Sequence, residues 1–104
     1  MISVTLDRTG GQTVGFTVEN HGDTLVCAAV SLLVINTVNS IERLTTCSEF
    51  TYDYKDDGGF LTFSLTDKKT RHIEAGLLID ALVLGLCSTR DEYPDEISVK
   101  EVTS

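Results

Sequence analysis

The chain has little of what would mark it as a fibrous or nucleic-acid-binding protein. It has one proline, no tryptophan, and only eight lysines and arginines against sixteen aspartates and glutamates. The single proline and the scattered glycines argue against collagen-like and low-complexity classes. A net charge of −8 argues against direct binding to nucleic acid, which depends on clustered cations. The same charge favours a basic partner. It also keeps a small protein soluble, and charge alone does not separate these roles.

Cysteines and long apolar runs are also scarce. Cys27, Cys47 and Cys87 form an odd set without repeated spacing, which argues against a disulfide framework and favours reduced thiols in the cytoplasm. The longest apolar runs, 25–35 and 76–87, are shorter than the ~20 residues that cross a bilayer. The first twenty residues do not read as a signal peptide. We therefore expect a cytoplasmic protein that does not bind membranes.

Hydrophobic periodicity predicts strands and two helices. Alternating residues indicate strands over 2–6, 14–18, 50–54, 61–65 and 97–99. The first helix is expected over 24–44 with Asp23 or Thr24 as its cap, and the second from Asp67 or Thr70 to Glu92, ended by Tyr93-Pro94. The turns at 9–12 and 56–59 would close two hairpins. The order ββαββαβ predicts one two-layer α+β domain over residues 1–104, with a largely antiparallel sheet and two helices.

Both predicted helices are apolar around most of their circumference. A helix on one side of a sheet usually keeps a polar stripe toward water. Burying the remaining apolar surface needs another layer, and a second copy of the chain is the simplest one. We therefore expect a homodimer packed through its helices, with Leu32, Ile35, Leu82 and Leu86 among the candidate contacts.

Cys27 is the first candidate for chemistry, because it falls in the first turn of the first predicted helix. The N–H groups and the dipole at a helix N-terminus favour an anion, here a thiolate. His21 lies six residues earlier at a predicted strand end, where its imidazole would be in reach of the sulfur. The backbone N–H groups around Cys27 and Ala28 are candidate donors to an oxyanion.

A structural role is the competing interpretation of these residues. Cysteine outside disulfides is among the most buried residue types, and Cys27 is flanked in sequence by apolar residues. Histidine at a strand end is usually a surface or capping residue. Cys47 and Cys87 are expected to be structural, and His72 to be solvated. The spacing of these side chains does not fit zinc ligands, and a Gly-rich phosphate loop is missing, so we expect no metal and no organic cofactor.

The stretch from His21 to Ser31, HGDTLVCAAVS, resembles the ribosomal-processing cysteine protease (Prp) family. That family has a Gly-His element, then an Asp, then a helix start reading Cys-Ala-Ala-Val-Ser. Agreement continues at Val38-Asn39, at the Asp57-Gly58-Gly59 turn and at Tyr93-Pro94. The resemblance thus spans nearly the whole chain.

The resemblance implies a homodimeric bacterial cysteine endopeptidase. It would remove a short N-terminal extension from the twenty-seventh large-subunit (50S) ribosomal protein, cutting after an aromatic-rich segment. It also implies that Cys27 is the nucleophile, that His21 is the general base and acid, and that Asp23 and Ser31 support them. Ser31 follows Cys27 by four residues, which independently places both on one helix face.

Two departures from the family pattern stand out. Many members have a long mobile loop between the histidine and the cysteine, whereas five residues separate His21 from Cys27 here. The alignment of His21 is therefore open, and we prefer it as the base because it directly follows a strand. Asn20 stands where the family has glycine, and asparagine tolerates positive φ better than most residues.

Several interpretations of function stay open. Asp23 would orient His21, attract basic substrate residues, or cap the helix. The whole chain would alternatively be a non-catalytic dimeric module that binds ribosomes, having lost cleavage along with the loop. A third reading is a thiol redox sensor in which Cys27 is the oxidisable thiolate.

Overall fold

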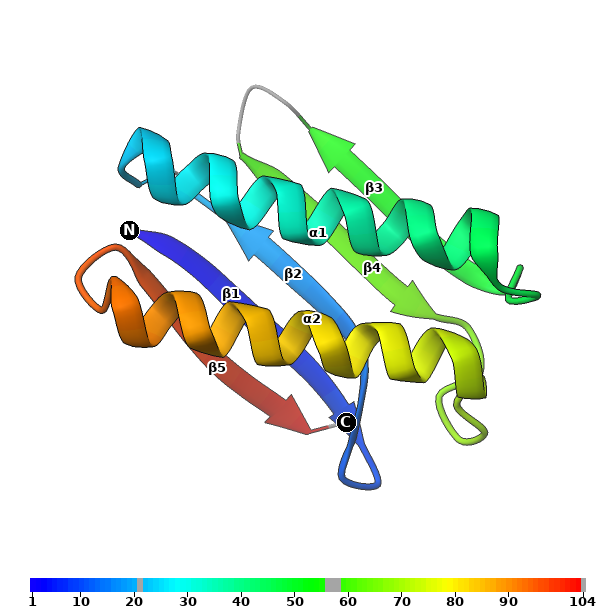
Figure 1. The fold of residues 1–104 in the computed structure, drawn as a ribbon. Helices are drawn as coiled ribbons and strands as arrows, with labels where there is room; N and C mark the ends of the chain where they lie inside the picture. The colour runs from blue at the N-terminus through cyan, green and yellow to red at the C-terminus, as the bar shows by residue number, and fades with distance from the viewer. Residues whose placement is uncertain (21, 56–58, 104) are drawn as a thin grey trace.

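The structure, a computed structural model, describes residues 1–20, 22–55 and 59–103 (Figure 1). The elements follow the predicted order ββαββαβ. The helices are α1 (Thr24–Leu44) and α2 (Ile73–Glu92). The strands are β1 (Ile2–Thr9), β2 (Gln12–Glu19), β3 (Phe50–Lys55), β4 (Phe60–Leu65) and β5 (Ile97–Thr103).

The strands form one mixed sheet in the order β3-β4-β2-β1-β5. Strands β1 and β2, β2 and β4, and β3 and β4 pair antiparallel, whereas β5 runs parallel to β1. Both helices lie on the same face of the sheet (Figure 1). The predicted two-layer α+β fold with a mostly antiparallel sheet is confirmed.

The core lies between the helices and the covered face of the sheet. Period-two alternation brings every second residue of β1 and β4 to that face, and the residues between them are only half-buried. Phe63 of β4 stacks on Phe16 and on Phe50, with ring centroids 5.1 Å apart in both pairs. The helices complete the core with Val26, Val30, Val34, Val38, Ile41, Ala75, Ile79, Leu82 and Leu86.

The first hairpin turns at Gly10 and Gly11, whose φ values of 59° and 80° suit a tight two-residue turn. The second predicted turn falls on residues 56–58, which lie outside the described residues. Only Gly59 beside them is described, and its φ of 59° is again positive.

The start of α2 differs from the prediction, because the helix begins at Ile73 rather than at Asp67 or Thr70. The Asp67 carboxylate oxygen Oδ1 accepts hydrogen bonds from the Lys69 and Thr70 amides, at 3.1 and 3.0 Å. These bonds form a turn that competes with helix. The helix ends at Glu92, and the predicted stop at Tyr93-Pro94 is confirmed.

The outer faces of both helices carry exposed apolar side chains. Leu25 and Leu32 of α1 are 66% and 72% exposed, and Leu77 and Leu84 of α2 are 69% and 72% exposed. Placing Leu82 and Leu86 in a contact between copies is wrong, because both are core residues with at most 2% of their surface exposed. They occupy the α2 face that packs on the sheet.

Helix α1 has the length and apolar composition of a membrane-spanning segment. Core helices of soluble domains pass the same test. In this structure, one face of α1 packs against the sheet through Val26, Val30, Val34, Val38 and Ile41.

Candidate active site

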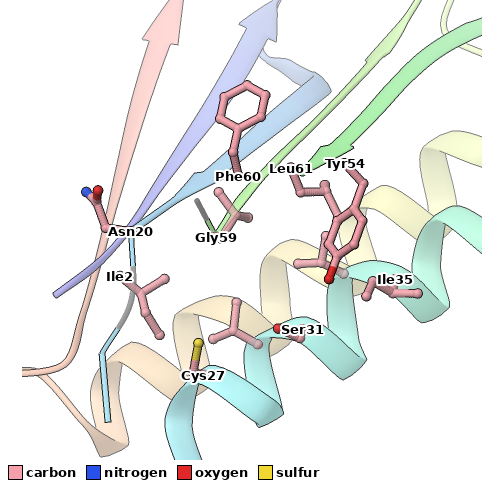
Figure 2. Close-up of a pocket in the computed structure, with 12 residues that line it drawn as sticks. Ile2, Asn20, Cys27, Ser31, Ile35, Tyr54, Gly59, Phe60 and Leu61 are labelled. Atoms are coloured by element: carbon pink, nitrogen blue, oxygen red, sulfur yellow. The ribbon is translucent and has the colours of Figure 1, made fainter. Parts of the chain in front are cut away.

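A cavity of about 140 Å³ lies between the first half of α1 and the ends of the strands beneath it. One wall is Cys27, Ser31 and Ile35, which share a face of α1 because four residues separate each from the next. The opposite wall includes Tyr54 from β3 and Leu61 from β4. Figure 2 shows the Tyr54 ring extending from β3 toward the helix, near Ile35.

Cys27 is the fourth residue of α1 and therefore lies in its first turn, as the sequence predicts. Its side chain is half-buried and lines the cavity. Its backbone N–H donates to the Asp23 carbonyl oxygen at 2.8 Å, closing the first hydrogen bond of the helix. The helix therefore already uses this N–H, and an oxyanion site among the amides around Cys27 and Ala28 stays a prediction.

Asp23 is the N-cap of α1. Its carboxylate oxygen Oδ2 accepts a hydrogen bond of 3.1 Å from the Leu25 amide. A carboxylate at this place also interacts favourably with the helix dipole. Of the three roles expected for Asp23, the structure shows the capping role.

Ser31 is one turn after Cys27, and the two side chains lie beside the same cavity (Figure 2). This is the shared face that the four-residue spacing predicts. The supporting role of Ser31 in catalysis stays a prediction.

His21 lies outside the described residues, so its contact with Cys27 stays a prediction. Its two neighbours are described. Asn20 lines the cavity with Cys27 and has a φ of 71°, in agreement with the tolerance expected of asparagine. Gly22 packs on Ile2 and Glu96. Asn20 and Gly22 both lie at the end of the molecule where α1 begins.

The other two cysteines lie elsewhere. Cys47 is 7% exposed and belongs to the core, which confirms its structural role. Cys87 is half-buried and lines a shallow groove beside Arg8 and Arg71. None of the three cysteines forms a disulfide in this structure.

His72 is not simply solvated as expected. It is the N-cap of α2, and its Nδ1 accepts a hydrogen bond of 3.2 Å from the Ala75 amide. Its Nε2 lies 3.0 Å from Thr46 Oγ1. Since Nδ1 accepts, Nε2 carries the proton and donates to the threonine hydroxyl. Within the described residues, no cluster of three His, Cys, Asp or Glu side chains could hold a metal ion.

Sequence reasoning missed the strand side of the cavity. Tyr54 and Leu61 are direct partners across the β3–β4 ladder, so their side chains share a face. The alternation of both strands was visible in the sequence and placed each on an apolar face. The alternation does not predict that α1 lies over Tyr54 and Leu61, because that position depends on the tertiary fold.

Comparisons with known proteins identify the family of this chain. The family model described as cysteine protease Prp matches residues 1–98. The ribosomal processing cysteine protease Prp of Bacillus subtilis is 33% identical over 82 residues, which cover 76% of this chain and 71% of that protein.

Solved structures give the same result. The essential ribosomal processing protease Prp from S. aureus, in complex with a covalently linked product peptide, has a TM-score of 0.88 at 25% identity, covering 98% of this chain and 100% of that one. SMU.848 from Streptococcus mutans has a TM-score of 0.82 at 28% identity, covering 100% and 96%.

The family model and the B. subtilis relative together define the class of this protein, a cysteine protease. The chain belongs to the cysteine protease Prp family. It is therefore a hydrolase, with homologues in bacteria. The extent of the domain over residues 1–104 stays a prediction.

Proposed function

We propose that this protein is a cytoplasmic cysteine endopeptidase that removes the short N-terminal extension of the twenty-seventh large-subunit ribosomal protein. The observation that carries the proposal is the position of Cys27, in the first turn of α1 and at the wall of an apolar cavity, in a Prp-family chain. The relatives from B. subtilis and S. aureus are named as ribosomal processing proteases, which supports the substrate class.

Cleavage would proceed through an acyl-enzyme. His21 accepts the proton of the Cys27 thiol, and the thiolate attacks the scissile carbonyl carbon. When the tetrahedral intermediate collapses, the C–N bond breaks and His21 returns the proton to the leaving amine. Water then hydrolyses the thioester, with His21 again as base. The covalently linked product peptide of the S. aureus protease supports a covalent route.

Oxyanion stabilisation would come from amides earlier in the turn than Cys27. The Leu25 amide donates to Asp23, and the Cys27 amide donates to the Asp23 carbonyl. Because the helix begins at Thr24, the amides of Thr24 and Val26 lack a helical carbonyl four residues back. These two amides are the candidate donors.

The cavity suits an apolar substrate side chain. Ile35, Tyr54 and Leu61 offer it an apolar surface next to the thiol. Tyr54 is 46% exposed, so a bound peptide would have surface to cover there. The charge of −8 would attract a basic ribosomal protein over long range.

A homodimer is the proposed assembly. Leu25 and Leu32 on α1 and Leu77 and Leu84 on α2 are each at least 66% exposed, and the two helices pack side by side on one face (Figure 1). A second copy covering these leucines would remove from water an apolar surface that a monomer leaves exposed.

A redox sensor would need a second cysteine able to form a disulfide with Cys27, and Cys47 does not meet this requirement. Cys27 is near the start of α1, whereas Cys47 follows its end at Leu44. Seventeen helical residues at about 1.5 Å each place Leu44 about 25 Å from Cys27, and the three residues from Leu44 to Cys47 reach at most about 11 Å. A disulfide requires Cα atoms within about 7 Å. Cys47 therefore cannot resolve an oxidised Cys27 within one copy.

The test is cleavage of a peptide that spans the N-terminal extension of the host's ribosomal protein, followed by mass spectrometry. We expect cleavage at one bond and loss of that activity when Cys27 is alkylated. Binding of the peptide without cleavage would favour the non-catalytic module instead. Cleavage that continues after complete alkylation of Cys27 would refute the proposed mechanism.

A further inference from the structure

Glu96 joins three elements at the end of the molecule that carries the site. It immediately precedes β5, and its amide donates to the Tyr93 carbonyl at 3.0 Å, closing the turn after α2. Its carbonyl accepts from the Ile2 amide at 2.9 Å, at the start of β1. Its carboxylate oxygen Oε2 accepts from the Asp23 amide at 2.8 Å, just before α1. These three places lie together at one end of the fold (Figure 1).

Gly22 packs directly on Glu96. A β-carbon at position 22 would lie 3.1 Å from Glu96 Oε2 and 3.2 Å from its carbonyl oxygen. It would also lie 3.2 Å from Cγ1 of Ile2. Such contacts are tighter than ordinary van der Waals separation. A side chain at position 22 would therefore press on the Glu96 carboxylate that accepts from the Asp23 amide.

The contact with Asp23 leads to the nucleophile in one further step. The Asp23 carbonyl accepts the Cys27 amide at 2.8 Å, and the Asp23 carboxylate accepts the Leu25 amide at 3.1 Å. The peptide unit at Asp23 therefore fixes the first turn of α1, and Glu96 fixes Asp23. The backbone of Glu96 is itself hydrogen-bonded to β1 and within the α2–β5 turn. Glu96 therefore joins the first turn of α1 to the sheet.

We propose that Glu96 is a positioning residue for the Cys27 nucleophile. The inference rests on the proposed function, because it gives Glu96 a role in orienting Cys27 for attack. A displacement of about 1 Å at a reacting group can lower the rate by about 100-fold. The loss of one hydrogen bond at an exposed amide lowers stability only slightly, because water replaces the acceptor.

Variants at and around Glu96 distinguish a loss of catalytic rate from a loss of stability. Glu96→Ala removes the acceptor, whereas Glu96→Gln removes the charge but retains an oxygen that accepts from the Asp23 amide. Asp95→Ala is the matched control, since Asp95 is the adjacent carboxylate and is exposed. Gly22→Ala perturbs the same contact from the opposite side without altering any polar group.

The experiment measures kcat and KM on the ribosomal peptide together with thermal unfolding. We expect Glu96→Ala to lower kcat about tenfold with KM changed less than about twofold, and Glu96→Gln to recover most of that loss. Gly22→Ala should lower kcat as well, and Asp95→Ala should match wild type. An unchanged kcat in Glu96→Ala, or a Glu96→Gln variant as impaired as the alanine variant, would overturn the proposal.

A second readout does not depend on the substrate. Iodoacetamide alkylation of Cys27, referenced to Cys87 in the same molecule, should slow in Glu96→Ala and recover in Glu96→Gln. If wild type fails to cleave the peptide, the proposed function is wrong, and the alkylation ratio still decides the role of Glu96. An equal ratio in wild type and Glu96→Ala would overturn that role even if cleavage were observed. If Glu96→Ala does not fold, the same ratio in Gly22→Ala and Glu96→Gln gives the answer.

Discussion

Gly76 packs so closely against Arg71 that a β-carbon at position 76 would lie 2.5 Å from Arg71 Nε. The arginine is held in place at its other end. Its Nη1 donates to the Thr13 carbonyl at 3.2 Å, and its two Nη atoms bind the Asp80 carboxylate at 2.8 and 3.0 Å. Gly76 is therefore required for space rather than for backbone freedom.

Gly76→Ala should lower the free energy of unfolding by about 1–3 kcal/mol, the usual range for overpacking. Gly85→Ala is the matched control on the same helix, because its β-carbon would lie 3.5 Å from the Leu33 methyl groups, an ordinary contact. It should gain about 0.5–1 kcal/mol from helix propensity. Urea denaturation measures both, and a gain in stability for Gly76→Ala would contradict the packing described above.

Cys27→Ser should abolish cleavage while the fold is retained. A serine hydroxyl is nearly isosteric, but a helix terminus does not ionise it, so the nucleophile is lost. Cys87→Ser should keep activity, and Cys47→Ser should lose only stability, because Cys47 is in the core. Mass spectrometry of the peptide digest gives the result. Full cleavage by Cys27→Ser, or equal loss in all three variants, would reject Cys27 as the nucleophile.

Stability should fall at alkaline pH in a way that depends on Tyr52. Burial raises the pKa of Tyr52 above its usual 10.0. The folded state therefore favours the neutral phenol, and this contribution is fully present below pH 10 and is lost as the pH rises through the folded pKa. Urea midpoints on both sides of pH 10 should show a smaller alkaline loss in Tyr52→Phe. An identical alkaline loss in both proteins would contradict the prediction.

His72→Ala should cost about 1 kcal/mol of stability, the usual value of an N-cap. The imidazole Nδ1 accepts the Ala75 amide, and alanine leaves that amide without its acceptor. His72→Asn should restore most of the loss, because asparagine is among the preferred caps. Denaturant unfolding of the three proteins tests this. Equal stability of His72→Ala and wild type would show that the cap contributes nothing.

Leu84→Glu should convert the proposed dimer into a monomer. Leu84 is 72% exposed on the outer face of α2, so a charged side chain there is tolerated in one copy but not in an apolar contact. Thr51→Glu is the control on the uncovered face of the sheet. Light scattering should give half the mass for Leu84→Glu only. A monomeric wild type at micromolar concentration would refute the dimer.

Local sequence patterns predicted much of the fold. The 24–44 helix was predicted with its observed bounds, because a continuous apolar segment begins after the capping Asp23. The start of α2 was missed because the Asp67 turn depends on side-chain hydrogen bonds that compete with helix. Leu82 and Leu86 were assigned to an interface because periodicity does not say which apolar face of a helix meets the sheet.

Only part of the site could be predicted from the sequence, because some of its residues are distant from one another along the chain. Cys27 and Ser31 are close in sequence, and their helical spacing predicted a shared face. Tyr54 and Glu96 are brought to the same end of the molecule only by the topology. The Asp23–Glu96 bond joins residues 73 positions apart, and no local pattern signals it.

The parallel pairing of β1 with β5 has a consequence for the order of events during synthesis. Ile2 pairs opposite Ile97, so β1 acquires this neighbour only after β2, α1, β3, β4 and α2 have been made. Pairing over such a sequence distance also folds slowly. Until Glu96 has emerged, the first turn of α1 lacks its anchor on the sheet. A chain that stops before Glu96 should therefore contain Cys27 but lack the contact that joins the first turn of α1 to the sheet.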